Sequence, residues 1–144
     1  MQIAILDIPQ MTNLPPTCNQ LEKNLSQGIK ALYREQTAHP PQKITCKLFS
    51  RYLAIVNEEA LTPVEKSLWG FGREELSKQI RSEIDKLIKP KLVELVESMT
   101  TAKIEEILSS VTFSSNKSGI LVILSAPPLI RNTSSLPKYR KKSF

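Results

Sequence analysis

The sequence predicts an α+β fold in two layers. A four-stranded, largely antiparallel sheet made of two hairpins carries a long kinked helix and a second helix on one face. Two stretches with apolar residues at every third or fourth position indicate the amphipathic helices, and β-type sequence with short connections follows each of them. Because an amphipathic helix must bury its apolar stripe, we expect both helices to cover the same side of one sheet.

The first helix is predicted to begin after Thr17, because residues 17–20 have the spacing of a capping box. His39 and the two prolines after it end the helix. Its apolar face consists of Leu21, Leu25, Ile29, Leu32 and Tyr33. Residues 43–56 then alternate or are continuously apolar, which predicts a hairpin that turns at Ser50 and Arg51.

Residues 61–70 open the longest helical region. Thr62 and Glu65 have the spacing of a second capping box. Pro63 occupies the first helical position, where its missing N–H leaves no hydrogen bond unmade. Two glycines lie close to the end of this stretch, at positions 70 and 72. They predict a bend between a short helix and a long one.

The long helix is predicted over residues 73–99, where the apolar spacing persists for several turns. Pro90 lies inside this pattern, and the apolar face continues on both sides of it, which favours one kinked helix over two helices. Arg81 and Asp85 are four residues apart on the other face. We expect them to form part of a solvated surface.

Residues 107–113 and 120–124 predict the second hairpin. Since the last strand is apolar on both sides, we expect a second copy of the chain to cover the open side of the sheet in a homodimer. The predicted organisation is an N-terminal extension over residues 1–16, one domain over residues 17–126 and a disordered basic tail over residues 127–144.

The net charge of +6 is concentrated in the tail. Four of these charges fall within the last seven residues, on Lys138, Arg140, Lys141 and Lys142. The folded part is therefore nearly neutral. The four basic residues are candidates for phosphate or anion binding, so a nucleic-acid-associated regulator is one functional alternative. A solvated terminus and an anionic membrane surface are the other interpretations of this segment.

The sequence shows no pattern typical of an enzyme or of a metal or cofactor site. His39 is the only histidine, and Cys18 and Cys46 lack the spacing of metal ligands. Glycine-rich phosphate-binding motifs are absent from the sequence, as is any apolar run long enough to span a membrane or to form a signal peptide. We therefore expect a soluble, cytoplasmic, non-enzymatic protein without a cofactor.

Trp69 and Phe71 flank Gly70 at the predicted bend between the two helices. Their aromatic rings either pack into the core at the bend or form an exposed anchor for a partner protein. Both interpretations remain open from the sequence alone.

One stretch of the chain combines Leu61, Thr62, Pro63, Glu65, Lys66 and Leu68. This stretch resembles the signature of the MpsC-like family of small bacterial proteins. In that family a helix and a hairpin precede this stretch, and a long helix with an internal proline and a terminal strand follow it. The resemblance covers roughly residues 18–125. Thr101 and Ser110 depart from the family pattern, which usually has glycine at the first position and often aspartate at the second.

The resemblance implies a biological setting. The family is associated with a sodium-translocating system that generates a membrane potential, and the other components of that system resemble inorganic-carbon transporters. This implies an accessory or regulatory protein that acts through protein–protein contacts, linked to sodium or bicarbonate transport. The family brings no catalytic residues to this chain.

Overall fold

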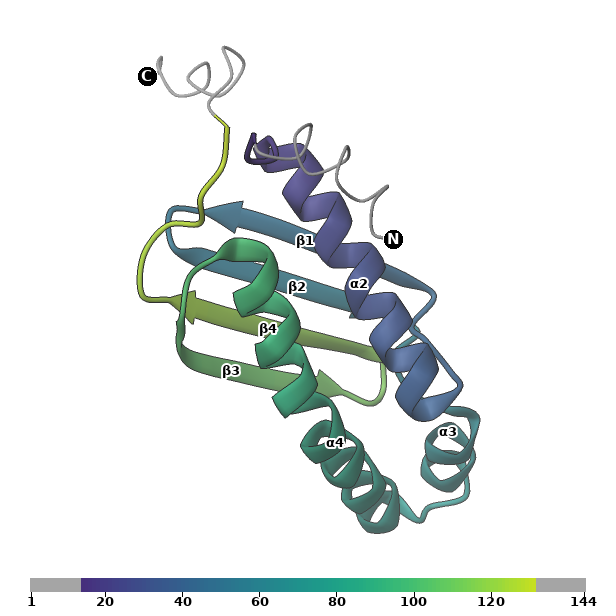
Figure 1. Cartoon of the computed structure of the whole chain (residues 1–144). Coiled ribbons are helices and arrows are strands. Elements are labelled where there is room, and N and C mark those ends of the chain that lie inside the picture. The colour runs from purple at the N-terminus through teal and green to yellow at the C-terminus, as the bar shows by residue number, and fades with distance from the viewer. Residues whose placement is uncertain (1–13, 132–144) are drawn as a thin grey trace, which may run out of the picture.

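The computed structural model describes residues 14–131, and it has the predicted α+β architecture (Figure 1). The helices and strands follow in the predicted order. They are α2 (Cys18–Thr37), β1 (Lys43–Phe49), β2 (Tyr52–Glu58), α3 (Pro63–Gly70), α4 (Glu74–Thr100), β3 (Ile104–Thr112) and β4 (Lys117–Leu124).

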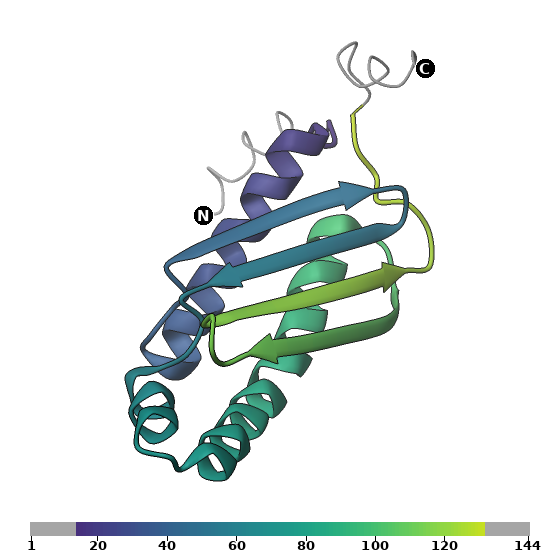
Figure 2. The ribbon, with the colours of Figure 1, turned by 180° about the vertical axis from the view of Figure 1, so that it is seen from behind.

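The two hairpins join into one antiparallel sheet with the strand order β1-β2-β4-β3, so that β2 and β4 lie side by side at its centre. Helices α2 and α4 lie across the same face of this sheet (Figure 1). Figure 2 shows the opposite face, which no helix among residues 14–131 covers.

The local signals act as the sequence predicts. Thr17 and Thr62 each close a complete capping box, and Pro63 occupies the start of α3. Ser50 adopts a left-handed backbone with φ of 59° in the β1–β2 turn. Helix α4 runs without interruption through Pro90, which confirms one helix rather than two.

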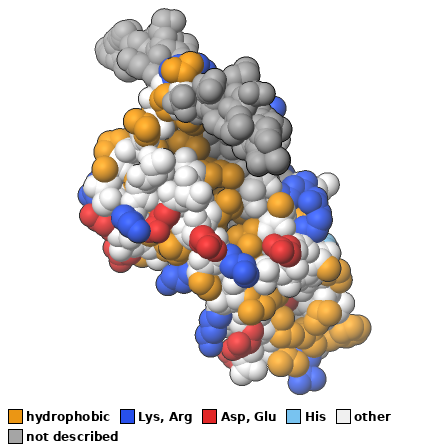
Figure 3. All heavy atoms as spheres, in the orientation of Figure 1, with side chains coloured by type: hydrophobic (Ala, Val, Ile, Leu, Met, Phe, Trp, Pro, Cys, Tyr) orange, Lys and Arg blue, Asp and Glu red, His pale blue; other side chains and the backbone are white. Residues whose placement is uncertain are grey.

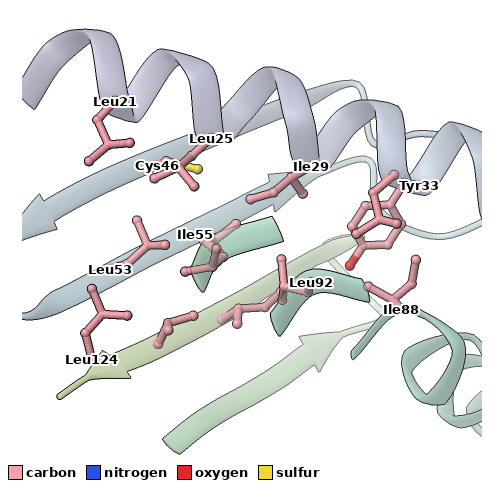
Figure 4. Close-up of a cluster of buried hydrophobic side chains, with 14 residues drawn as sticks. Leu21, Leu25, Ile29, Tyr33, Cys46, Leu53, Ile55, Ile88, Leu92 and Leu124 are labelled. Carbon is pink, nitrogen blue, oxygen red and sulfur yellow. The ribbon is translucent and has the colours of Figure 1, made fainter. Parts of the chain in front are cut away.

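The core fills the space between the two helices and the inner face of the sheet (Figure 4). Leu25 and Ile29 of α2, Val96 of α4 and Ile55 and Val122 of the central strands are fully buried. Burial of an aliphatic side chain of this size contributes roughly 1.5–3 kcal/mol each. This layer fixes α2 and α4 on the sheet.

Several details differ from the prediction. Strand β3 begins at Ile104 rather than at residue 107, and a register shift follows between Ile104 and Glu106. The prediction that Arg81 lies on a solvated surface is wrong, because its side chain is buried against α3. The buried carboxylate of Glu65 on α3 draws it inward.

Part of the predicted tail lies on the domain. The Leu129 N–H donates to the Thr100 carbonyl at 3.4 Å, and the Arg131 N–H donates to the Pro16 carbonyl at 2.7 Å. Ile130 packs against the core between these two contacts. The other predictions for the two ends of the chain fall on residues 1–13 and 132–144, outside the described residues.

Candidate functional site

Helix α3 has two faces with opposite character. Glu65 and Trp69, four residues apart, face the rest of the domain. Val64 and Leu68 are four residues apart on α3, and Phe71, the residue that caps its C-terminus, follows three residues later and continues the same stripe. We call these three residues the elbow stripe, since α3 lies at the bend that leads into α4 (Figure 1).

The inward face of α3 is held by a buried ion pair. The Glu65 carboxylate accepts from Arg81 at both oxygens, with Nε to Oε2 at 2.7 Å and Nη2 to Oε1 at 2.7 Å. Glu65 Oε1 also accepts from the Thr62 N–H at 2.8 Å and from the Thr62 hydroxyl at 2.9 Å. Since Glu65 has no exposed surface and Arg81 is 5% exposed, water contributes little to solvating either charge.

Further hydrogen bonds complete this network. Arg81 Nη2 donates to the Ala60 carbonyl at 3.0 Å, and the Ser77 hydroxyl donates to the Glu65 carbonyl at 2.9 Å. Arg81 Nη1 lies 3.5 Å from Asp85 Oδ1 on the solvent side. Removing one partner of such a pair leaves an uncompensated buried charge, which typically costs about 3–5 kcal/mol. Arg81 therefore locks α3 onto α4.

Helix α3 is also tied to the β3–β4 turn at both of its ends. Before the helix, the Leu61 N–H donates to Asn116 Oδ1 at 2.7 Å. Near its end, the Trp69 ring stacks on Phe113 with 4.7 Å between the ring centroids. Lys78 Nζ lies 6.0 Å from the Trp69 ring centroid. The short helix is thus fixed both to α4, through Arg81, and to the β3–β4 turn.

Two residues of the elbow stripe are exposed to solvent. Phe71 is 84% exposed and Val64 is 57% exposed. Figure 3 shows hydrophobic side chains gathered over the position of α3. Gly72, with φ of +80°, turns the chain immediately after Phe71. A rigid helix with an exposed aromatic ring is typical of a surface that binds another protein.

The uncovered face of the sheet is a second candidate interaction surface. Phe49, Val56 and Leu108 are exposed large apolar residues on this face. A shallow hollow of about 360 Å³ lies at its centre, beside Gly119. The hollow forms because glycine leaves space between the side chains of the neighbouring strands.

A small cavity of about 70 Å³ lies under the covered face of the sheet, lined by residues that include Tyr33, Asp85 and Ser118. Burial raises the pKa of Tyr33 to about 12, with a smaller contribution from the nearby Asp85 carboxylate. Burial also raises the pKa of Asp85, against the opposing effect of Arg81. Ser118 accepts from Asn57 Nδ2 at 2.9 Å, and Asn57 Oδ1 is buried without a hydrogen-bond partner. A cavity of this size and polarity suits ordered water.

The candidate residues from the sequence lie at different places in the structure and do not form one site. Trp69 packs on Phe113 as part of the domain, whereas Phe71 faces outward. The His39 N–H donates to the Thr37 hydroxyl just after α2. Cys18 is half-buried at the start of α2, and Cys46 is buried in β1. Both thiols are free.

The basic residues Lys138, Arg140, Lys141 and Lys142 lie outside the described residues. Within residues 14–131, no three histidine, cysteine or carboxylate side chains gather where they could hold a metal ion.

Sequence reasoning missed two of these features. The capping box accounts for Glu65 by itself, so its buried partner sixteen residues later left no local signal. The spacing of Val64, Leu68 and Phe71 was visible in the sequence. It could have been recognised as an apolar stripe that runs beside Glu65 on α3.

Comparison with known proteins places the chain in a family. The family model described as "Na+-translocating membrane potential-generating system (MpsC)" matches residues 17–126. No curated protein and no solved structure matches the chain. Residues 14–131 contain no helix whose length and hydropathy suit a membrane crossing.

Proposed function

Since this chain belongs to the MpsC family, we propose that it is a non-enzymatic accessory or regulatory protein of a Na+-translocating, membrane-potential-generating system. It acts through protein–protein contacts, on the cytoplasmic side of the membrane and as a homodimer. The free thiols of Cys18 and Cys46 suit a reducing compartment. The partner is a component of the transport system, and the link extends to sodium or bicarbonate transport.

The observation that carries this proposal is the elbow stripe. Among residues 14–131, Phe71 is the most exposed of the large hydrophobic side chains, and α3 is held by the Glu65–Arg81 pair. Rigid presentation of an aromatic side chain lowers the entropy lost on binding, which raises the affinity available from a small contact. An exposed stripe of this kind favours a binding role.

The proposal is tested by replacing Phe71 with aspartate in cells that carry the transport system. We expect at least about tenfold less of its membrane components to co-purify with the Phe71→Asp variant, since an aromatic anchor typically contributes 2 kcal/mol or more. The membrane potential, measured with a voltage-sensitive dye, should fall as it does when the whole chain is deleted.

Leu87→Asp is the matched control. Leu87 is 54% exposed on α4 and does not belong to the elbow stripe, so the same change in charge should leave both measurements at the wild-type level. Thermal unfolding of both purified variants checks that each still folds. Undiminished co-purification and membrane potential in the Phe71→Asp variant would contradict the proposal.

A further inference from the structure

The uncovered face of the sheet is built from four rows of side chains, which the strand register defines. Each row crosses β1, β2, β4 and β3 in that order. The rows are Phe49, Tyr52, Ile123 and Glu106; then Lys47, Ala54, Leu121 and Leu108; then Thr45, Val56, Gly119 and Ser110; and finally Lys43, Glu58, Lys117 and Thr112. The middle of this face is apolar, and charged residues lie at its margins.

We propose that a second copy of the chain covers this face, related by a two-fold axis that runs parallel to the strands between β2 and β4. The inference deepens the homodimer proposed above by naming its interface and its symmetry. It does not depend on the elbow stripe, which lies on α3 and stays free in such a dimer.

The shapes of the central residues match under this symmetry. The axis exchanges β2 and β4, so Val56 of one copy lies over Gly119 of the other. Val56 is 42% exposed and projects from the sheet, whereas Gly119 lines the hollow. In the neighbouring row the same operation sets Leu121 over Ala54. In the two middle rows, large side chains therefore meet small ones beside the axis, which allows two sheets to pack closely there.

The charges match as well. Glu58 and Lys117 are register partners at one end of the face. The parallel axis sets Glu58 of one copy opposite Lys117 of the other, and both cross-copy pairs form at once. Opposite charges placed in this way favour the correct pairing and its register.

A two-fold axis perpendicular to the strands gives a poorer match. It would invert the order of the rows, so Lys117 would lie against Ile123 and Lys43 against Phe49. Glu58 would lie against Tyr52 in the same way, so no pair of opposite charges would form between the two copies. The Glu58–Lys117 pairs between the copies thus favour the parallel axis, although both axes place large residues over small ones in the two middle rows.

The size of the face suits a reversible dimer. Four strands about 4.8 Å apart and about seven residues long, at about 3.3 Å per residue, cover roughly 450 Å² in projection. The accessible area of a face covered with side chains exceeds its projection, so two faces bury on the order of 1,000–1,300 Å² together. This lies at the lower end of specific interfaces. The dimer should therefore dissociate measurably on dilution.

Gly119 offers a test that spares the fold. A Cβ atom added at Gly119 meets nothing within 4 Å, so the folded protomer accepts a larger residue there. In the dimer, however, a leucine at this position would occupy the space that Val56 of the second copy requires. We expect Gly119→Leu to raise the dissociation constant at least about tenfold in sedimentation equilibrium of the purified full chain.

Gly70→Leu is the matched control. A Cβ atom at Gly70 also meets nothing within 4 Å, but Gly70 ends α3, away from the sheet. This variant should dimerise as the wild type does. A chain that stays monomeric up to about 100 µM, or a Gly119→Leu variant that dimerises normally, would overturn the proposal.

Charge exchange tests the orientation of the axis. Glu58→Lys alone and Lys117→Glu alone should each weaken the dimer, and the double variant should restore it. Restoration supports the parallel axis, whereas a double variant weaker than either single one would refute it. Failure of these experiments leaves the transport assays with Phe71→Asp unaffected, so the two proposals fail separately.

Discussion

On β2, successive side chains alternate between a face that α2 and α4 cover and a face that no described helix covers (Figures 1 and 2). Leu53 and Ile55 point to the covered face and have no exposed surface. Ala54 and Val56 point to the other face, and Val56 is 42% exposed. Burial therefore alternates along the strand, whereas polarity does not.

This difference is informative because an antiparallel sheet with one solvated face usually carries polar residues on that face. Here the polar residues of β2 and β4 gather at one end of the sheet instead. Asn57 and Ser118 meet on the covered face, and Glu58 and Lys117 lie beside them on the open face. An open face that stays apolar along the rest of its length favours association with another surface.

The largest expected difference between the two faces is in the stability of the protomer. Ile55→Ala should lower the free energy of unfolding by about 2–5 kcal/mol, because it opens a cavity in the core. Val56→Ala should lower it by less than about 1 kcal/mol, because Val56 is already partly hydrated in the protomer. Urea denaturation of the protein at a dilution where it is monomeric keeps dimer formation out of the measurement. Equal losses for the two variants would contradict the assignment of one face as covered and the other as open.

The burial of Tyr33 on the covered face should make the stability of the protein depend on pH. Burial raises the pKa of Tyr33 from 10.0 to about 12. Between these values the folded chain keeps a proton that the unfolded chain has released, so stability falls as the pH rises. Tyr33 should therefore contribute a loss of about 1.4 kcal/mol for each pH unit in this window, and none of it below pH 10.

The measurement compares wild type with Tyr33→Phe by chemical denaturation at pH 9, 10 and 11. The variant lacks the ionisable phenol, whereas the remaining tyrosines are common to both proteins. The wild type should lose stability relative to the variant as the pH rises above 10. Parallel pH profiles for the two proteins would show that Tyr33 is not buried as the structure places it.

The order of the elements and the side of the sheet that the helices cover could be predicted from the sequence, because those features rest on local signals. The capping boxes at Thr17 and Thr62 and the periodic leucines and isoleucines act within a few residues of chain. The start of β3 was less predictable. Glu105 and Glu106 interrupt the apolar alternation there, and strand pairing with β4 decides the outcome.

The candidate surfaces depend on contacts between distant residues. Arg81 and Asp85 have the spacing of a solvated pair, yet Glu65 draws Arg81 into the interior because a buried carboxylate requires a counter-ion. From the sequence, the same two interpretations applied to Trp69 and to Phe71. Phe113 then pairs with Trp69, and only Phe71 stays free to face outward.

The smallest expected effect concerns the polar residues at the end of the sheet. Ser118→Ala removes the hydroxyl that accepts from Asn57 Nδ2. The other polar atom of that asparagine side chain, Oδ1, already lacks a partner. A buried donor left without its hydrogen bond typically costs about 1–3 kcal/mol. Lys117→Ala, one residue away on the open face, should change protomer stability by less than about 0.5 kcal/mol. Urea denaturation of both variants at a dilution where the chain is monomeric compares the two faces directly. If Ser118→Ala lowers stability as little as Lys117→Ala does, water reaches Asn57 on the covered face. The contrast in burial between the two faces would then not extend to the last two residues of β2.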